Sequence, residues 1–223
     1  MNLALFDLDH TLIPIDSDYC WGQFLIERGI VEAQSFKAAN DRFYEQYKLG
    51  TLNIQEYLTF ALSPMAGKEA ALVNSWHQDY MQAVIEPQIT PAALALVQKH
   101  QEQGDLCALV TATNEFVTAP IAKRFQLEHL LAPLCERLPD GTLTGRSVGI
   151  PAFASGKITR VNSWLAERGK SLASFEKSWF YSDSRNDLPL LRAVSHPVAT
   201  NADDTLRAEA IAKGWQCLEL FAS

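Results

Sequence analysis

The feature that most constrains the fold is an alternation of short apolar segments and helical segments along the second half of the chain. Segments of strand length occupy residues 106–110, 179–182, 197–200 and 217–220. Segments with helical patterns occupy residues 115–125, 157–167, 187–194 and 204–213. Such an alternation favours a parallel sheet with right-handed crossover connections. With a further buried strand at 3–8, the sequence predicts an α/β chain built on a doubly wound parallel sheet.

The segment between the first two predicted strands has a different pattern. From about 17 to 85, apolar and aromatic residues recur at helical spacing, and glycines divide the stretch into about four helices. Examples are Trp21, Phe24, Leu25, Phe43, Tyr44 and Tyr47. We therefore expect an α/β core at 1–14 and 87–223 and a helical cap domain at 15–86.

Two local signals complete the prediction of secondary structure. Thr90 followed by Pro91 is typical of an N-cap with proline at the first helical position. Residues 138–141, Leu-Pro-Asp-Gly, lie inside a β-prone stretch and predict a hairpin turn.

Composition and charge restrict the classes of partner. The chain of 223 residues has a net charge of −7, a pI near 5.2 and no run of lysine or arginine. Nucleic acid and anionic membrane surfaces both require a basic footprint, so we expect neither as a partner. No apolar run has the length of a bilayer span, and residues 1–6 lack the marks of a signal peptide. The four cysteines are scattered without zinc-site spacing. A cytoplasmic protein with reduced thiols is expected.

Acidic and hydroxyl side chains collect where the predicted strands end. Asp7 and Asp9 end the first strand, Thr111 follows the second, and Asp183 and Asp187 follow the segment at 179–182. Lys157 lies at the start of a predicted helix. Ligands of open α/β sheets bind outside the carboxyl ends of the strands, so we expect these groups to form one site.

The chemistry of this set fits phosphoryl transfer. Hard carboxylate oxygens suit Mg²⁺, and the metal and Lys157 would together neutralise a phosphate so that an anionic aspartate can attack it. A second carboxylic acid could protonate the leaving oxygen and later deprotonate water. Taken alone, each motif has an ordinary structural explanation, such as a helix cap, a solvated turn or a surface lysine.

In this arrangement the sequence resembles the haloacid dehalogenase (HAD) superfamily, subfamily IB, the branch that contains phosphoserine phosphatases. Residues 7–11, Asp-Leu-Asp-His-Thr, resemble the DxDxT motif of that family. Thr111 and Lys157 resemble its second and third motifs, and Asp183 with Asp187 resembles the DxxxD form of its fourth. The resemblance covers nearly the whole chain. It implies a Rossmann-like core with a helical C1-type cap inserted after the first strand.

The resemblance also implies a role for each motif residue. Asp7 would be the nucleophile that forms an aspartyl-phosphate, and Asp9 the general acid and base. Lys157 would neutralise charge, with Thr111 and the Ala112 amide on the phosphate oxygens. Mg²⁺ would be held by Asp7, the backbone carbonyl of Asp9 and Asp183. Asp187 would lie behind these ligands and orient Lys157 or water at the metal.

The substrate is less constrained, because the sequence departs from phosphoserine phosphatases at several positions. His10 stands where they carry a small residue or serine, and Thr-Ala-Thr at 111–113 where they carry Ser-Gly-Gly. Asp16 lies near their acidic residue for the substrate amine, yet it could equally be a helix N-cap. The expected substrate is a small phosphomonoester, with phosphoserine and histidinol phosphate as candidates; relatives in this branch also act on lipid phosphates.

Several cap residues remain open between two interpretations. Arg28 and Arg42 could bind a substrate carboxylate or phosphate, although a solvated helix face is the simpler explanation. Two alternative functions also remain at this stage. A phosphotransferase would pass the phosphate to an acceptor other than water, and a non-catalytic regulatory protein would bind phosphate on the same fold.

Overall fold

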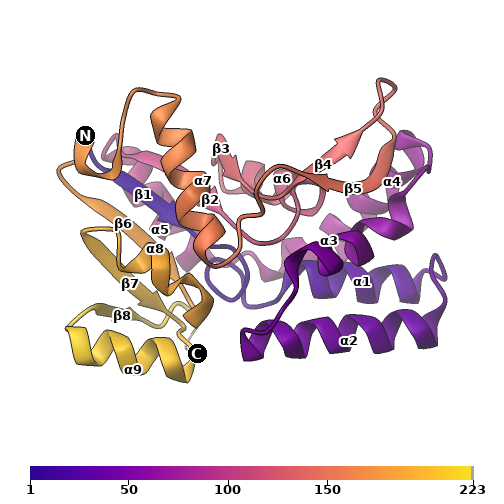
Figure 1. Cartoon of the computed structure of the whole chain (residues 1–223), viewed down its shortest axis with the longest axis horizontal. Coiled ribbons are helices and arrows are strands. Elements are labelled where there is room, and N and C mark those ends of the chain that lie inside the picture. The colour runs from indigo at the N-terminus through magenta and orange to yellow at the C-terminus, as the bar shows by residue number, and fades with distance from the viewer. Residues whose placement is uncertain (222–223) are drawn as a thin grey trace.

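A computed structural model describes residues 1–221 and contains one large parallel sheet with helices on both faces (Figure 1). The strand order is β3-β2-β1-β6-β7-β8, and every neighbouring pair is parallel. The strands are β1 (Leu3–Phe6), β2 (Leu106–Val110), β3 (His129–Leu131), β6 (Ser178–Ser182), β7 (His196–Thr200) and β8 (Gln216–Leu218). The predicted α/β fold with a doubly wound parallel sheet is confirmed.

Strand β1 lies at the centre of the sheet because its side chains are apolar on both faces. All four of its residues are buried. Leu3 and Leu5 pack into one hydrophobic cluster, whereas Ala4 and Phe6 pack into another on the opposite face. This alternation follows from the two-residue period of a strand, and burial on both faces is typical of a parallel sheet.

The helices that cover the sheet begin at recognisable caps. Thr90 accepts a hydrogen bond from the Ala93 amide and caps α5 (Pro91–Glu102), as predicted. Asn114 caps α6 (Glu115–Arg124) in the same way. The remaining helices of this part are α7 (Ser155–Ala166), α8 (Leu188–Leu191) and α9 (Asp204–Lys213).

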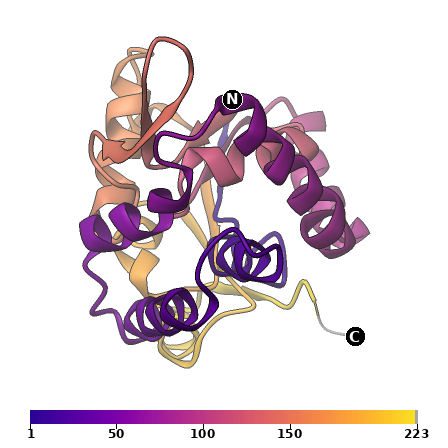
Figure 2. The same ribbon diagram turned by 90° about the vertical axis from the view of Figure 1, so that its right-hand side faces the viewer.

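Four α-helices lie between β1 and α5, as expected from the helical periodicity. They are α1 (Ser17–Glu27), α2 (Ala33–Leu49), α3 (Ile54–Leu62) and α4 (Ala70–Tyr80). In Figure 2, where the right-hand side of Figure 1 faces the viewer, these helices lie in front of the sheet. Gly50 ends α2 with φ of 70°, a left-handed conformation that glycine adopts without strain. The division into a core and a cap domain at 15–86 stays a prediction.

An antiparallel hairpin packs against these helices. Its strands are β4 (Leu134–Arg137) and β5 (Leu143–Val148), joined at the predicted turn. The Gly67 amide donates to the Leu143 carbonyl at 2.8 Å. A Cβ at Gly145 would lie 2.7 Å from the Ala66 Cβ, so only glycine permits this approach. The hairpin thereby joins the second half of the chain to the helices before it.

Some predicted elements are shorter in the structure. Strand β1 ends at Phe6, so Asp7 follows the strand and does not lie within it. The helix predicted at 187–194 is a 3-10 turn, η5 (Arg185–Asp187), followed by α8. Helix α8 ends at Leu191 with Arg192 as its C-cap, before the predicted end at residue 194. The other short segments are η1 (Ser63–Met65), the π-helical η2 (Met81–Ile85), η3 (Glu86–Gln88) and η4 (Leu172–Ser174). Among the described residues, no helix is long and apolar enough to cross a membrane.

Candidate active site

Lys157 lies between two carboxylates at the ends of different strands. Its ammonium is 2.9 Å from Asp7 Oδ1 and 2.7 Å from Asp187 Oδ2. The side chain of this lysine, which lies in the first turn of α7, is 3% exposed. The Ser182 hydroxyl also donates to Asp187 Oδ2 at 2.6 Å. Asp7, Lys157 and Asp187, which are 30 to 180 positions apart in the sequence, thus form one buried cluster.

Burial and the neighbouring charges shift the pKa values of Asp7 and Lys157. Burial raises the pKa of Asp7 well above its usual value, although the Lys157 ammonium opposes that shift. Burial alone would lower the pKa of Lys157, yet the neighbouring Asp187 and Asp7 outweigh it and the pKa is raised. Lys157 therefore carries a proton at neutral pH and supplies a fixed positive charge beside Asp7.

Asp183 is held by the hydroxyl of Thr11. The Thr11 hydroxyl donates to Asp183 Oδ1 at 3.1 Å and accepts from the Asp183 amide at 3.0 Å. Burial and the nearby Asp187 raise the pKa of Asp183 well above its usual value. The cluster therefore contains three carboxylates and one ammonium, a deficit of positive charge.

The excess of carboxylates over ammonium groups in this cluster bears on whether its residues fit Mg²⁺. The buried oxygens of Asp7 and Asp183 are hard ligands. Burial raises the pKa of Asp7, and repulsion from Asp187 and Asp183 adds to that shift. A divalent cation would relieve this repulsion, so the donor set fits the metal. Among residues 1–221, no group of three or more His, Cys, Asp or Glu side chains is placed to hold a metal. A site made of the Asp7 and Asp183 carboxylates and the Asp9 carbonyl uses only two such side chains, and it stays a prediction.

The carboxylate of Asp9 is held by hydrogen bonds from Ser17 and Thr113 and not by Lys157. Its Oδ1 accepts from the Ser17 amide and its Oδ2 from the Thr113 hydroxyl, both at 2.7 Å. Burial raises the pKa of Asp9 to about 6, and the nearby Asp16 adds to the shift. A carboxyl group with this pKa can exchange a proton near neutral pH.

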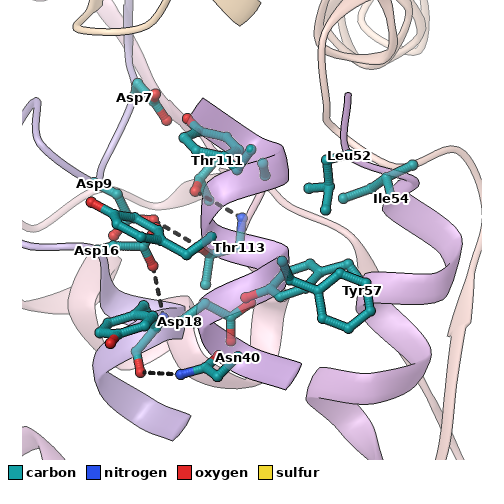
Figure 3. Close-up of a pocket in the computed structure, with 15 residues that line it drawn as sticks. Asp7, Asp9, Asp16, Asp18, Asn40, Leu52, Ile54, Tyr57, Thr111 and Thr113 are labelled. Carbon is teal, nitrogen blue, oxygen red and sulfur yellow. Dashed lines mark hydrogen bonds between the residues drawn. The ribbon is translucent and has the colours of Figure 1, made fainter. Parts of the chain in front are cut away.

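Thr111 and Ala112 follow β2 and line the same pocket as Asp7 and Asp9 (Figure 3). Thr111 is buried, and its hydroxyl accepts from the Thr113 amide at 3.2 Å. The structure therefore brings the predicted phosphate-binding residues next to the predicted nucleophile. The hydroxyls of Thr11, Thr113 and Ser182, which hold the acids in place, were not assigned these roles from the sequence.

Asp16 acts as the N-cap of α1 in this structure. Its Oδ1 accepts from the Tyr19 amide at 2.7 Å. Burial raises its pKa, and the hydrogen bonds from the Tyr19 and Asp18 amides oppose the shift. Of the two predicted roles, the cap is the one that the geometry displays, and amine binding stays a prediction.

His10 has φ of 55° and its Nε2 is 3.5 Å from the Tyr44 hydroxyl.

The pocket runs from the strand ends to helices α1, α2 and α3 (Figure 3). It holds about 520 Å³ of space, open solvent at its mouth included. Its walls are formed by Asp7, Asp9, Asp16, Asp18, Tyr19, Asn40, Phe43, Tyr44, Tyr47, Leu52, Ile54, Tyr57, Thr111, Ala112 and Thr113. Neither Arg28 nor Arg42 belongs to these walls: Arg28 pairs with Asp79, and Arg42 stacks on the Phe43 ring. Both are exposed, as the simpler interpretation predicted.

Comparison with known proteins identifies the lineage. Residues 4–192 match the family of haloacid dehalogenase-like hydrolases. The chain belongs to that family. It is 46% identical over 217 residues to a histidinol-phosphatase of Neisseria meningitidis, with 97% of this chain and 98% of the relative covered. It is 31% identical to a phosphoserine phosphatase of Mycobacterium tuberculosis, covering 96% of this chain and 69% of that one.

Solved structures give the same result for the fold of this HAD hydrolase. A Bordetella pertussis protein of unknown function is 47% identical, with a TM-score of 0.93 over 99% of both chains. A phosphoserine phosphatase in a phospho-aspartyl intermediate analogue form has a TM-score of 0.66 at 20% identity, covering 97% of this chain and 92% of that one. The HAD chain is accordingly an enzyme of the phosphoric monoester hydrolase class.

Proposed function

We propose that this HAD hydrolase is a Mg²⁺-dependent phosphatase in which Asp7 is the nucleophile. The observation that carries the proposal is the contact of the Lys157 ammonium with Asp7, 2.9 Å from its Oδ1, at the edge of the pocket. A fixed positive charge beside the attacking carboxylate offsets the repulsion between that carboxylate and an anionic phosphate. Thr111 and Ala112 lie on the same wall and would bind the phosphate oxygens.

The reaction would proceed in two displacements. An oxygen of Asp7 attacks the phosphorus, the bond from phosphorus to the leaving alcohol breaks, and Asp9 donates its proton to the leaving oxygen. Asp9, now a carboxylate, takes a proton from water, and that water attacks the aspartyl-phosphate. The bond from phosphorus to Asp7 breaks, which releases phosphate and restores both groups. The pKa of about 6 at Asp9 suits an acid that later acts as a base.

Mg²⁺ would be held by Asp7, Asp183 and the Asp9 carbonyl. When bound, it would neutralise charge on the phosphate and on the carboxylates around it. Asp187 would keep Lys157 in place, since its Oδ2 is fixed by both the lysine and Ser182. These assignments rest on the donor chemistry and on the family resemblance.

The substrate would be a small phosphorylated metabolite. The pocket at the strand ends is lined by aromatic side chains and by a few polar groups, as small-molecule sites usually are. The names of the relatives make histidinol phosphate and phosphoserine the first candidates.

Phosphate release from a panel of phosphomonoesters tests the proposal. The panel includes histidinol phosphate, phosphoserine, sugar phosphates and an aryl phosphate, each with Mg²⁺ or with a chelator, and Asp7→Asn protein is the blank. Turnover that requires both Mg²⁺ and Asp7 is expected. Release that persists in Asp7→Asn protein would exclude Asp7 as the nucleophile.

Rapid quenching during turnover tests the intermediate. Acid-quenched protein should carry phosphate that is lost on treatment at high pH, as expected for an acyl phosphate. Phosphate release in water, compared with release in the presence of added alcohols, would separate hydrolysis from transfer to another acceptor.

A further inference from the structure

The part of the pocket wall formed by the start of α1 is rich in acidic side chains. Asp16 and Asp18 come from the start of α1 and face the same space as Asn40 of α2 and Tyr57 of α3 (Figure 3). Together with Asp9, this wall holds three acidic side chains. We call these three residues the pocket acids.

Within residues 1–221, none of the pocket acids pairs with a lysine, arginine or histidine. No basic residue of that range lines the pocket either. The nearby cations have other partners: Lys157 lies between Asp7 and Asp187, and Lys48 stacks over Tyr44 and pairs with Glu45. The wall is therefore acidic without a counter-ion from the protein.

Asp18 differs from the other two pocket acids in its hydrogen bonds, because its donors are side chains and not backbone amides. It is 4% exposed, and its Oδ1 accepts from the Asn114 side-chain amide at 3.2 Å. Burial raises its pKa to about 7, the nearby Asp16 adds to the shift, and a hydrogen bond from the Tyr57 hydroxyl opposes it. By contrast, Asp9 and Asp16 accept backbone amides at 2.7 Å. A buried carboxylate without a cation is costly, and a bound cation would remove that cost.

The rest of the pocket also suits a cation. Tyr44, Tyr47 and Tyr57 line it together with Phe43. Aromatic faces attract ammonium and imidazolium groups, and they do so more strongly when water is excluded. A carboxylate on the substrate would instead meet the pocket acids with no basic residue to receive it.

From this charge distribution we infer that the pocket selects phosphomonoesters whose alcohol carries an ammonium or similar cation and no carboxylate, with Asp18 as a specificity residue. The inference rests on the proposed phosphatase activity. Attraction at the pocket acids favours the cationic alcohol, and repulsion at the same groups disfavours an amino acid such as phosphoserine.

Three isosteric esters separate these effects. Serinol phosphate carries an ammonium and a hydroxymethyl group. Phosphoserine replaces the hydroxymethyl group with a carboxylate, and glycerol 1-phosphate replaces the ammonium with a hydroxyl. We expect kcat/KM for serinol phosphate to exceed that for each of the other two by about tenfold or more. Equal values, or a preference for phosphoserine, would overturn the inference, and this experiment needs no variant.

A substitution assigns the selectivity to Asp18. In Asp18→Asn protein, the ratio of kcat/KM for serinol phosphate to that for glycerol 1-phosphate should fall about tenfold, and Asp18→Glu should restore part of it. The matched control is Asp79→Asn, which removes an exposed acid that pairs with Arg28. A ratio that does not change in Asp18→Asn protein would overturn the role of Asp18.

The outcomes also separate this inference from the proposed function. Hydrolysis of glycerol 1-phosphate that depends on Asp7, without a preference for serinol phosphate, would leave the phosphatase standing and overturn only the charge selection. Failure to hydrolyse any ester of the panel in the presence of Mg²⁺ would overturn both.

Discussion

Two groups of buried acids meet in this enzyme, and they differ in how their charge is balanced. The strand-end acids, Asp7 and Asp187, hold the ammonium of Lys157 between them. The pocket acids, represented by Asp18, have no such partner in residues 1–221. The fold thus supplies a cation where the chemistry needs a fixed charge. On the pocket side, the missing cation is left for a ligand to supply.

This difference has physical consequences that can be measured. A buried ion pair resists removal of either partner, because the remaining charge is then left without compensation. A buried acid without a cation is instead relieved by protonation or by neutral replacement. The two groups should therefore respond in opposite directions to substitution by a neutral side chain.

The largest effect is expected at Lys157. Lys157→Met keeps the length of the side chain but leaves Asp7 and Asp187 buried without their cation. We expect turnover to fall by about 10²–10³-fold and the free energy of unfolding to fall by about 3–5 kcal/mol. Phosphate release and urea unfolding measure the two effects.

Lys99→Met is the matched control, because Lys99 is an exposed lysine in the last turn of α5 and does not line the pocket. That variant should behave as the wild type in both assays. Near-normal turnover in Lys157→Met protein would show that Asp7 does not depend on the ammonium.

The second-largest effect is expected in the pH dependence of the free energy of unfolding, through Asp18. Its pKa is about 7 in the folded chain against 3.8 for an ordinary aspartate. A raised pKa contributes stability that is full below pH 4 and is lost as the pH rises through 7. This loss is roughly 4 kcal/mol, at about 1.4 kcal/mol per pKa unit. Without Mg²⁺, Asp18→Asn protein should therefore be close to wild type at pH 4 and more stable at pH 8.

Urea unfolding of both proteins between pH 4 and 8 provides this measurement. Parallel curves for the wild type and Asp18→Asn would show that Asp18 is not a buried acid without compensation. Asp9, with a pKa of about 6 from the same cause, should leave part of the pH dependence in the variant.

A smaller effect of opposite sign is expected at Asp187. Asp187→Asn removes one partner of Lys157 and the acceptor of the Ser182 hydroxyl. We expect the free energy of unfolding at pH 8 to fall by about 2 kcal/mol, since hydrogen bonds to charged groups contribute about 1.5–3 kcal/mol. An Asp187→Asn protein that gains stability at pH 8, as predicted for Asp18→Asn, would remove the distinction between the two groups.

The smallest effect concerns the contact between the strand-end loop and the helices. The Asn186 side chain donates to the Tyr47 carbonyl at 3.1 Å, and Arg185 donates to the Leu49 carbonyl beside it. Both carbonyls lie at the end of α2, which lines the pocket. Asn186→Ala should raise KM about fivefold, from the loss of about 1 kcal/mol, with less change in kcat.

Asn74→Ala is the control for that experiment, as it removes an exposed asparagine from α4. A KM for Asn186→Ala equal to that of this control would show that the contact does not shape the pocket.

Much of the fold was predictable because its signals are local. The segment at 106–110 is apolar at every position, which indicates a buried parallel strand wherever it is placed. Thr90 and Pro91 marked the start of α5 for the same reason. The 3-10 turn at Arg185–Asp187 was not predicted, because contacts of its loop with distant residues set its shape. The Arg185 amide, for example, donates to Asp203 at 2.8 Å, a partner far along the chain.

Some residues of the candidate site could be predicted from the sequence, and others could not. Asp7, Lys157 and Asp187 could be expected together, since the ends of parallel strands meet at one edge of a sheet. Asp18 could not be found by that rule, because it lies on a helix and its neighbours come from other segments of the chain. Its place beside Asn114 and Tyr57 depends on how α1, α3 and α6 pack.

The sequence by itself indicated most element types, a parallel sheet and the acids at the strand ends, because hydrophobic periodicity and the alternation of strands with helices can be recognised from short segments of the chain. The tertiary structure alone decided which acids have a cation and which do not. Charge balance depends on the distances between side chains that are remote in sequence, as with the 30 positions between Lys157 and Asp187. That balance separates the acids we assign to the chemistry from those we assign to choosing the substrate.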